Sequence, residues 1–435
     1  MKSSKIILTN TFTCIALMAL ATFLFPSCTD DCETTYTYFS YEPIYTSLDE
    51  IRSSVAITEP EELKSPGKIY LYGNILLVNE HGKGIHVIDN QDKTAPKHLS
   101  FIDIPGNVDM AVKNNILYAD SYVDLLAFNI SDINNIQLIK RIEDTFPNYS
   151  TFGFHVDSDR GVVTDWKQTE TTEIAASDCN GEQPIDFFWR GNVLMSFAEG
   201  DMAASLQNRS VGNTTGIGGS MARFTIYQNF LYAVDDFDMH VFNISSPADP
   251  QENGIVNIGW GIETIFPYKD KLFIGARNGM HIFDNSTPTQ PQYMSTFQHA
   301  NSCDPVVVND EYAFVTLRSG TNCENFNNQL DVVDIKDLRN PTLVKTYPMT
   351  NPHGLGIDGN TLFLCEGASG LKVFNIEDVE NIDQNLRLHF DNLDAYDVIP
   401  FQNNLILIGV DGLYQFDYSD SDNLKLQSKL LIATE

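Results

Sequence analysis

The chain is 435 residues long and strongly acidic, with 58 aspartates and glutamates against 27 lysines and arginines and a net charge of −31. A surface of this sign repels nucleic-acid phosphates and anionic lipid headgroups, so nucleic acid is not expected as a partner and any membrane attachment should be covalent. Hydrophobic residues make up 43% of the chain, which is typical of a globular protein with a large core.

The N-terminus has the features of a secretory signal. Two lysines precede the mostly apolar run 6–25, and Ser27 and Cys28 follow it. A small residue directly before a cysteine resembles a lipobox, in which the cysteine is lipidated and becomes the first residue of the mature chain. We therefore predict a signal peptide over residues 1–27 and lipidation at Cys28. A signal that is cleaved elsewhere, or retained as an anchor, is the alternative.

Residues 28–63 are predicted to form a tether and an N-terminal cap. The acidic stretch TDDCE directly behind Cys28 resembles the surface-export signal of Bacteroidetes lipoproteins, although a plain solvated linker has the same composition. We expect a lipid-anchored protein of the outer membrane, displayed on the cell surface. No later apolar run approaches the roughly 18 residues that a membrane-spanning helix needs.

The main signal in the rest of the chain is an internal repeat. Seven segments share one pattern: an apolar run, a polar or glycine-containing turn, and a second run that ends in Asp or Asn. Such a terminal residue can accept a hydrogen bond from the backbone two residues on, which turns the chain out of the strand. These end markers are Asp89, Asn129, Asn243, Asp284, Asp334, Asn375 and Asp417, with spacings of 40, 114, 41, 50, 41 and 42 residues.

The apolar runs are predicted strands, because they are short, rich in β-branched and aromatic residues, and without a helical period. Most copies have a further strand on each side. The preceding strands are expected at 108–113, 264–268, 305–309, 355–358 and 398–402, and the following ones at 98–104, 136–142, 292–297, 342–347 and 424–431. Four antiparallel strands in about 40 residues predict an all-β fold, a β-propeller of four-stranded blades over residues 64–435.

One of these segments carries a family resemblance. LDVVD at residues 330–334 is close to the motif of LVIVD-repeat proteins, and GIHVID at 84–89 fits the same repeat. From about Lys68 to the end, one gap apart, the chain resembles the LVIVD-repeat lipoproteins of Bacteroidetes. The resemblance implies a β-propeller and an envelope location, and it implies no established reaction.

The gap is the long spacing between Asn129 and Asn243, which holds more than one blade needs. Residues 161–172 are either part of a strand pair or a degenerate blade. Residues 191–219, which include the run GIGG, are rich in small and polar residues and predict an insertion loop. We therefore predict seven blades with an insertion at about 144–219, and eight blades are the alternative.

The functional residues are predicted on one face of the propeller. Antiparallel strand order places the starts of the innermost strands and the turns between second and third strands on this face, around the mouth of the channel. The candidate ligand-binding residues are Asp109, Glu263, Asp304, His353 and Asp397 at the strand starts, and Arg277 and Arg318 in the turns. Further side chains of this face are Glu80, His81, Asp120, Asp124, Asp235, Asp236, Asp238 and Glu366. Such a ring can bind a cation, a sugar or a basic peptide, and a merely solvated rim is the alternative.

No catalytic signature is present: the sequence has no HExxH, P-loop, GxSxG or CxxC motif. His353 at a strand start is more often structural than an acid or base, and Trp166, Trp189 and Trp260 are expected to pack in the interior. We predict a non-enzymatic binding or interaction module for a glycan or a protein, without a cofactor, a divalent cation being one candidate ligand. A glycosidase- or lyase-type propeller enzyme and a structural subunit of an envelope complex are the alternatives.

A disulfide is predicted between Cys303 and Cys323. Cys303 precedes an inner strand, and Cys323 lies in the long turn between the second and third strands of the same blade. Two successive strands return the chain to the same face, so the two thiols can meet despite their separation in sequence. Export supplies the oxidising compartment that the bond needs. Two neighbouring free thiols are the alternative.

Overall fold

The computed structural model describes residues 32–148, 150–151, 154–157, 159–177, 215–299, 305–319 and 328–432. The chain divides into two compact units, one of residues 1–44 and 165–195 and the other of residues 45–164 and 196–435. Within the described ranges, no helix is long and apolar enough to cross a membrane. The predicted signal peptide and Cys28 lie outside these ranges.

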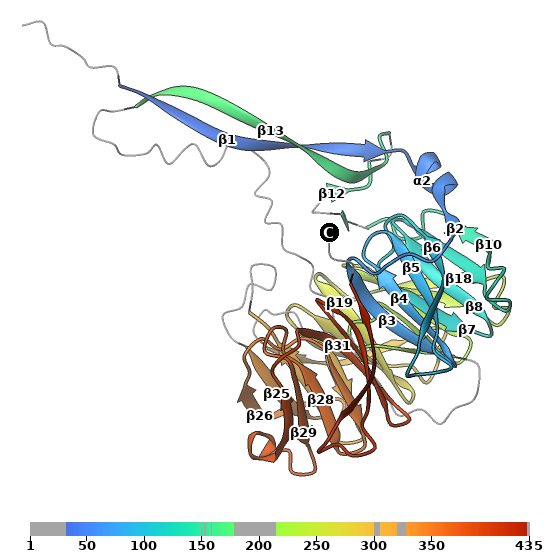
Figure 1. Cartoon of the computed structure of the whole chain (residues 1–435), viewed down its shortest axis with the longest axis vertical. Coiled ribbons are helices and arrows are strands. Elements are labelled where there is room, and N and C mark those ends of the chain that lie inside the picture. The colour runs from blue at the N-terminus through green and yellow to red at the C-terminus, as the bar shows by residue number, and fades with distance from the viewer. Residues whose placement is uncertain are drawn as a thin grey trace, which may run out of the picture. The chain divides into compact units, whose positions relative to one another are not determined.

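The first unit is built on a two-stranded ribbon. Strand β1 (Cys32–Thr46) pairs with β13 (Val162–Ser177), and the hydroxyl oxygens of Thr37 and Thr172 lie 3.3 Å apart across it (Figure 1). The tether therefore contains a long strand that the sequence did not predict. The alternative of a degenerate blade in the gap is wrong, because this part of the gap pairs with a strand that precedes the first blade.

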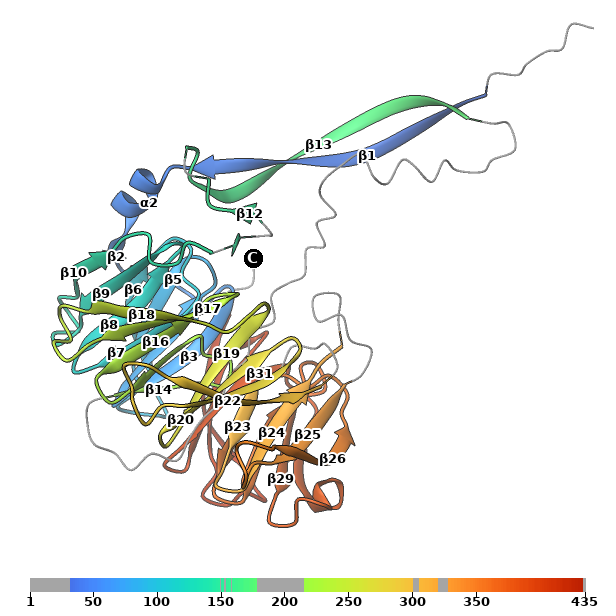
Figure 2. The same cartoon turned by 180° about the vertical axis from the view of Figure 1, so that it is seen from behind.

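The second unit contains a propeller of seven blades, as predicted, and each blade is a four-stranded antiparallel sheet (Figures 1 and 2). The sheets of blades 1 to 3, from inner to outer strand, are β3–β6 (Pro66–Tyr72, Ile75–Glu80, Gly84–Asp89, Lys97–Asp103), β7–β10 (Met110–Lys113, Ile116–Ser121, Asp124–Asn129, Gln137–Ile142) and β15–β18 (Phe224–Tyr227, Phe230–Val234, Asp238–Asn243, Gln251–Asn257).

Blades 4 to 7 repeat the same order. They are β19–β22 (Ile262–Tyr268, Lys271–Ala276, Gly279–Asp284, Gln292–Gln298), β23–β26 (Val306–Val308, Tyr312–Leu317, Gln329–Asp334, Thr342–Pro348), β27–β30 (Leu355–Asp358, Thr361–Cys365, Leu371–Asn375, Leu386–Phe390) and β31–β34 (Ala395–Phe401, Asn404–Gly409, Gly412–Asp417, Lys425–Leu431). The expected strands flanking the repeats are confirmed to within a few residues.

Short elements complete the second unit. Blade 1 gains β2 (Ala56–Thr58) at its outer edge and β14 (Ile217–Gly218) at its inner edge. Helix α2 (Leu48–Ser54) precedes the blades, β11 (Ser150–Thr151) pairs with β12 (Phe154–His155), and the 3₁₀ helix η2 (Ile382–Asn385) leads into β30.

The end markers turn the chain in every blade, as the sequence predicted. In each case the side-chain oxygen accepts a hydrogen bond from the backbone N–H two residues on, at 2.8–3.0 Å. The second and third strands lie between two neighbouring blades and are almost wholly buried, whereas most side chains of the outer strands are exposed or half-buried. The core therefore forms between blades and not within one.

The ring closes between blades 7 and 1 without a shared strand, because each of these blades is made from one continuous segment. Figure 1 shows the blue β3 beside the red β31. Apolar side chains of both blades pack at this joint, among them Ile69 and Val78 against Ile399 and Ile408. In the described residues, closure therefore rests on side-chain contacts and not on a strand shared by the two blades.

A buried amide pair crosses the same joint. Asn90 Nδ2 donates to Gln415 Oε1 at 3.0 Å, and Gln415 Nε2 donates to Asn90 Oδ1 at 2.7 Å. Asn404 Nδ2 also donates to Gln415 Oε1, at 2.9 Å. Gln415 lies two residues before its end marker, a position that the other blades fill with apolar side chains: Val87, Ala127, Val241, Ile282, Val332 and Val373. The glutamine thus belongs to the closing joint and not to the repeat.

The glycine-rich run of the gap lies inside the ring and is not simply a loop. Strand β14 pairs with β3, and the segment continues across the channel: Ser220 Oγ accepts from Leu355 N–H of blade 6 at 3.3 Å, and the Ala222 carbonyl accepts from Ile265 N–H of blade 4 at 2.8 Å. A side chain at Gly216 would come within 2.2 Å of the Tyr70 ring. Residue 216 is therefore a glycine because any larger side chain would collide with this ring.

The amide pair leads to a stability prediction. Replacing Gln415 by Val leaves the buried Asn90 without its partner, so we expect the free energy of unfolding to fall by about 1–3 kcal/mol in urea denaturation. The double variant Asn90→Ile/Gln415→Val carries side chains that other blades have at these positions, and it should regain part of the loss. Gln292→Val on an exposed outer strand is the control, expected within about 0.5 kcal/mol of the parent. Equal losses in the single and double variants would contradict a coupled pair.

Candidate functional site

The mouth of the ring is defined by the starts of the seven inner strands. Within the described residues their side chains are, in blade order, Lys68, Asp109, Arg223, Glu263, His353 and Asp397. Lys68 and Arg223 were not predicted from the sequence. Both stand 20 or 21 residues before an end marker, as Asp109 and Glu263 do, so counting back from the markers finds them. Asp304 lies outside the described residues.

Asp109 is a buried acceptor that joins three blades. Its Oδ2 accepts from Lys68 Nζ of blade 1 at 3.0 Å and from the backbone N–H groups of Arg223 and Phe224 in blade 3. Burial lowers the pKa of Lys68, and the charge of Asp109 opposes this shift. The carboxylate therefore holds inner strands together, and its oxygens face protein donors.

Asp120 is also buried and acts as an acceptor for the start of its own blade. Its Oδ1 accepts from the N–H groups of Val108 and Asp109 at 2.8 and 2.9 Å and from Asn107 Nδ2 at 2.8 Å. Burial raises the pKa of Asp120 to about 6, although these hydrogen bonds pull it down. The charge is thus retained at neutral pH at a cost in stability.

Asp124 ties helix α2 to blade 2. The helix begins at the N-cap Ser47, whose hydroxyl accepts from Glu50 N–H. Arg52 of the helix binds Asp124 through two hydrogen bonds of 2.9 Å, and Arg141 adds a third of 2.8 Å. Burial raises the pKa of Asp124, but these guanidinium contacts outweigh it and lower the pKa.

Two further turn carboxylates are each paired with a histidine of the following strand. Glu80 Oε2 lies 2.9 Å from His86 Nε2, and Asp235 Oδ2 lies 3.0 Å from His240 Nε2. Each carboxylate also accepts from two backbone N–H groups of nearby residues. Burial opposes ionisation, but these hydrogen bonds lower the pKa of both carboxyls. Their contacts are again with the protein itself.

His353 is held as a neutral ring. Arg318 Nη1 lies 3.3 Å from its Nδ1, and Asn351 Nδ2 lies 3.1 Å from its Nε2, while the Tyr396 ring packs at 5.0 Å. Burial, with the nearby charge of Arg318, lowers the pKa of His353 to about 3. A ring that stays unprotonated down to this pH cannot donate a proton at neutral pH.

The last two acidic positions are deeply buried. Glu366 pairs with Lys372 and accepts from Thr350 N–H at 2.8 Å, and Asp397 Oδ1 accepts from Val398 N–H at 2.5 Å. Their charges, together with burial, raise the pKa of the neighbouring Cys365 thiol. Neither carboxylate is exposed to solvent.

Glu263 and Arg277, in contrast, are only half-buried and lie beside an exposed tryptophan. Arg277 Nε donates to Glu263 Oε1 at 3.2 Å, with side chains 32% and 21% exposed. The guanidinium lies over the Trp260 ring, 5.0 Å from its centre. Trp260 is 53% exposed, so the expectation of interior packing is wrong for this residue. Burial raises the pKa of Glu263, while the charges of Arg277, Arg223 and Arg318 lower it.

The glycines around Trp260 explain its position. Gly259 and Gly261 have φ angles of +133° and +82°, which other residues rarely adopt. Gly261 N–H donates to the Asp236 carbonyl and its own carbonyl accepts from Arg277 N–H, both at 2.9 Å. The loop between blades 3 and 4 is therefore fixed on both sides, and it presents the indole outward.

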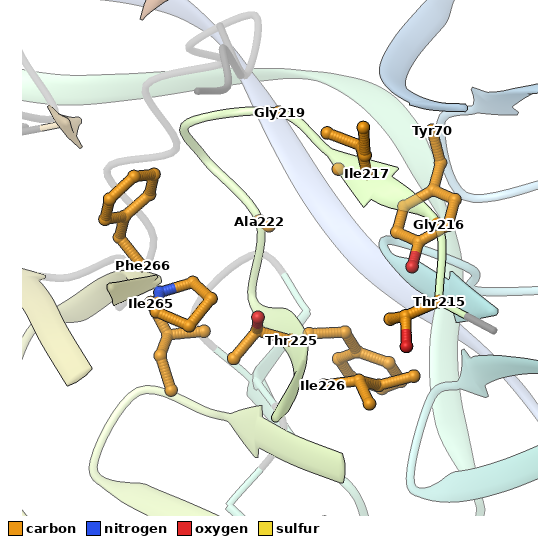
Figure 3. Close-up of a pocket in the computed structure, with 13 residues that line it drawn as sticks. Tyr70, Thr215, Gly216, Ile217, Gly219, Ala222, Thr225, Ile226, Ile265 and Phe266 are labelled. Atoms are coloured by element: carbon orange, nitrogen blue, oxygen red, sulfur yellow. The ribbon is translucent and has the colours of Figure 1, made fainter. Parts of the chain in front are cut away.

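A pocket lies inside the ring beside the crossing segment (Figure 3). It encloses about 470 Å³, part of it open to solvent, between that segment and strands β3, β15 and β19. Its lining is largely apolar or glycine, with Thr215 and Thr225 as polar side chains. Among the described residues that line it, Tyr70 alone has an ionisable side chain.

Within the described residues, no three His, Cys, Asp or Glu side chains are grouped so that they could hold a metal ion. Of the predicted ligand-binding residues, the structure brings two pairs together: Glu263 with Arg277, and Arg318 with His353. Cys303 and Cys323 lie outside the described residues, as does Trp189.

Comparison with known proteins supports the repeat. Residues 218–258 and 302–349 match the LVIVD repeat family. This chain carries LVIVD repeats. The two matches cover blades 3 and 5, and the second includes the LDVVD segment. No curated protein matches the sequence.

Solved structures are similar in fold. The computationally designed protein Ika8 is 11% identical, with a TM-score of 0.50 over 87% of this chain and 92% of its own. BamB from Moraxella catarrhalis is 8% identical, with a TM-score of 0.47 over 83% and 84% of the two chains. Sqt1 from Saccharomyces cerevisiae is 7% identical, with a TM-score of 0.48 over 85% and 86%. Identities this low concern the fold alone.

The raised pKa of Asp120 predicts a pH effect on stability. Its folded pKa of about 6 exceeds the ordinary value of 3.8, so its contribution to stability is complete below about pH 4 and is lost as the pH rises through 6. We expect Asp120→Asn to gain up to about 3 kcal/mol relative to the parent between pH 4 and pH 7, measured by urea denaturation. Asp383→Asn in the exposed turn of η2 is the control. A pH-independent difference for Asp120→Asn would contradict the shift.

Proposed function

We propose that this protein is a non-enzymatic binding module of the bacterial cell envelope, and that it binds its ligand at the mouth of the propeller. The observation that carries the proposal is the contrast between two kinds of polar side chain at this face. The buried carboxylates are engaged by backbone N–H groups, lysines, arginines or histidines. Trp260 is instead 53% exposed, and Arg277 and Glu263 beside it are half-buried.

This contrast favours binding over acid–base catalysis. A glycosidase needs two carboxyl groups that face the same substrate across a gap of roughly 5–10 Å. Here Asp109, Asp120 and Asp124 are hydrogen-bonded within the protein, and burial lowers the pKa of His353 to about 3, which makes it a weak base at neutral pH. An accessible aromatic ring with a charged pair beside it is typical of a recognition surface.

The envelope location rests on the N-terminal sequence. The apolar run followed by Ser27 and Cys28 has the form of a lipoprotein signal. A covalent anchor also suits the strongly acidic mature chain, which anionic lipids would repel. We propose the outer membrane, with the propeller on the cell surface.

Replacing Cys28 by Ala tests the anchor. The lipid is attached to the cysteine sulfur, so the variant should move from the membrane pellet to the soluble fraction, measured by immunoblotting after ultracentrifugation. Cys32→Ala, four residues on, is the matched control and should stay in the pellet. A Cys28→Ala protein that pellets with membranes and resists a high-salt wash would contradict lipid anchoring at this residue.

A ligand panel tests the binding role. Thermal unfolding of the purified protein is measured with acidic and neutral oligosaccharides, peptides and divalent cations. A ligand at 100 times its Kd stabilises the folded state by about 2.7 kcal/mol, so a true ligand raises the Tm. We expect one class to do so, and Trp260→Ala to abolish the shift. Tyr293→Ala, an equally exposed aromatic on the outer strand of the same blade, is the control. No shift with any class, or a shift that survives Trp260→Ala, would count against the proposed site.

A further inference from the structure

We propose that the loop at Trp260, with Arg277 and Glu263 of blade 4 and Arg223 and Asp236 of blade 3, binds an acidic saccharide through stacking on the indole and pairing of its carboxylate with the arginines. The inference rests on the proposed function and names its ligand class.

The first part of the site is the indole itself. Trp260 is 53% exposed and presents a large, flat aromatic surface to solvent. The two flanking glycines with positive φ allow the loop to project the side chain, and the hydrogen bonds from Gly261 and to its carbonyl fix the loop. A fixed, flat, apolar surface suits the C–H face of a pyranose ring.

The second part is a pair of half-exposed ion pairs on neighbouring blades. Arg277 and Glu263 are joined at 3.2 Å, and Arg223 Nη2 lies 3.1 Å from Asp236 Oδ1. The backbone joins the two pairs, because Asp236 accepts from Gly261, which in turn accepts from Arg277. The arginines offer forked donors for a carboxylate, and the carboxylates accept from sugar hydroxyls.

Arg277 is placed to serve both parts. Its guanidinium lies over the indole, and its Nε donates to Glu263. A ligand that stacks on the same tryptophan would therefore lie beside this guanidinium. One residue thus couples the apolar surface to the charged donors.

The positions of the arginines favour an anionic ligand. The chain has ten arginines in a protein of net charge −31, and the charges of three of them reach Glu263, where they oppose the rise in pKa that burial causes. A protein this acidic repels anions at long range, and salt screens the repulsion beyond about 8 Å. Binding of an anion therefore requires local cations, and Arg223 and Arg277 are the cations at this loop, each paired with a carboxylate.

Isothermal titration calorimetry with a galacturonic acid tetrasaccharide tests the inference. Its methyl ester is the matched ligand, because it keeps the rings and removes the charge, and inorganic phosphate tests the charge alone. We expect the acid to bind at least about 10-fold more tightly than the ester or phosphate, and more weakly as salt rises. Equal affinity for acid and ester, or for acid and phosphate, would overturn the acidic saccharide.

Variants separate the two parts of the site. Trp260→Ala and Arg277→Gln should each weaken binding of the acid by about 10-fold or more. Arg277→Lys keeps the charge but not the forked donor geometry, so its affinity should lie between those of the parent and Arg277→Gln. Tyr293→Ala should bind as the parent does, and thermal unfolding without ligand checks that each variant is folded. Unchanged binding in Trp260→Ala would overturn the site.

The result also distinguishes this inference from the binding role. If the tetrasaccharide does not bind while another ligand raises the Tm in a Trp260-dependent manner, the acidic saccharide is wrong and the binding module stands. If no ligand class shifts the Tm, both fail.

Discussion

The ring is closed by side-chain contacts between blades 7 and 1, without a shared strand, and the rest of the propeller depends on this closure. Every blade buries its faces against its neighbours, so one open joint would expose two of them to water. At the joint between blades 7 and 1 the apolar packing of the repeat continues, and the amides of Asn90 and Gln415 add a directional contact. Apolar packing fixes the distance between the two blades, whereas reciprocal hydrogen bonds also fix their register.

The acidic composition has a structural explanation at the mouth. Inner strands begin there, and their first N–H groups need acceptors that the sheet does not supply. Asp109, Asp120 and Glu80 accept from such N–H groups, in part across blades. Many carboxylates that seem from the sequence to form a binding ring are therefore part of the scaffold. The accessible charges are a smaller set, in which arginine is as prominent as glutamate.

The sequence predicts the repeat well because the repeat is local. Buried second and third strands are apolar runs, and each end marker makes its own turn, so blade number and most strand positions follow from the pattern. The outer strand β18 begins Gln-Glu-Asn-Gly and faces solvent, so it carries no such pattern and was not predicted. Strand β14 was missed because its pairing depends on β3, almost 150 residues earlier in the chain.

The site is predicted less well than the fold, for a similar reason. Counting back from the end markers finds which residues lie at the mouth, but it does not show which of their side chains are exposed. Asp397 and Glu263 occupy equivalent strand starts, yet one is fully buried and the other accessible. The difference arises from neighbouring loops, such as the glycine-flanked loop at Trp260, whose course depends on contacts with the adjacent blade.

The segment that crosses the channel affects the order in which the propeller can assemble. It follows blades 1 and 2 in the chain and precedes the other five. A polypeptide synthesised from its N-terminus therefore presents this segment, already able to pair with β3, before blades 4 and 6 emerge. The later blades can then pack around this segment. The centre of the ring is thus filled before all seven blades are in place.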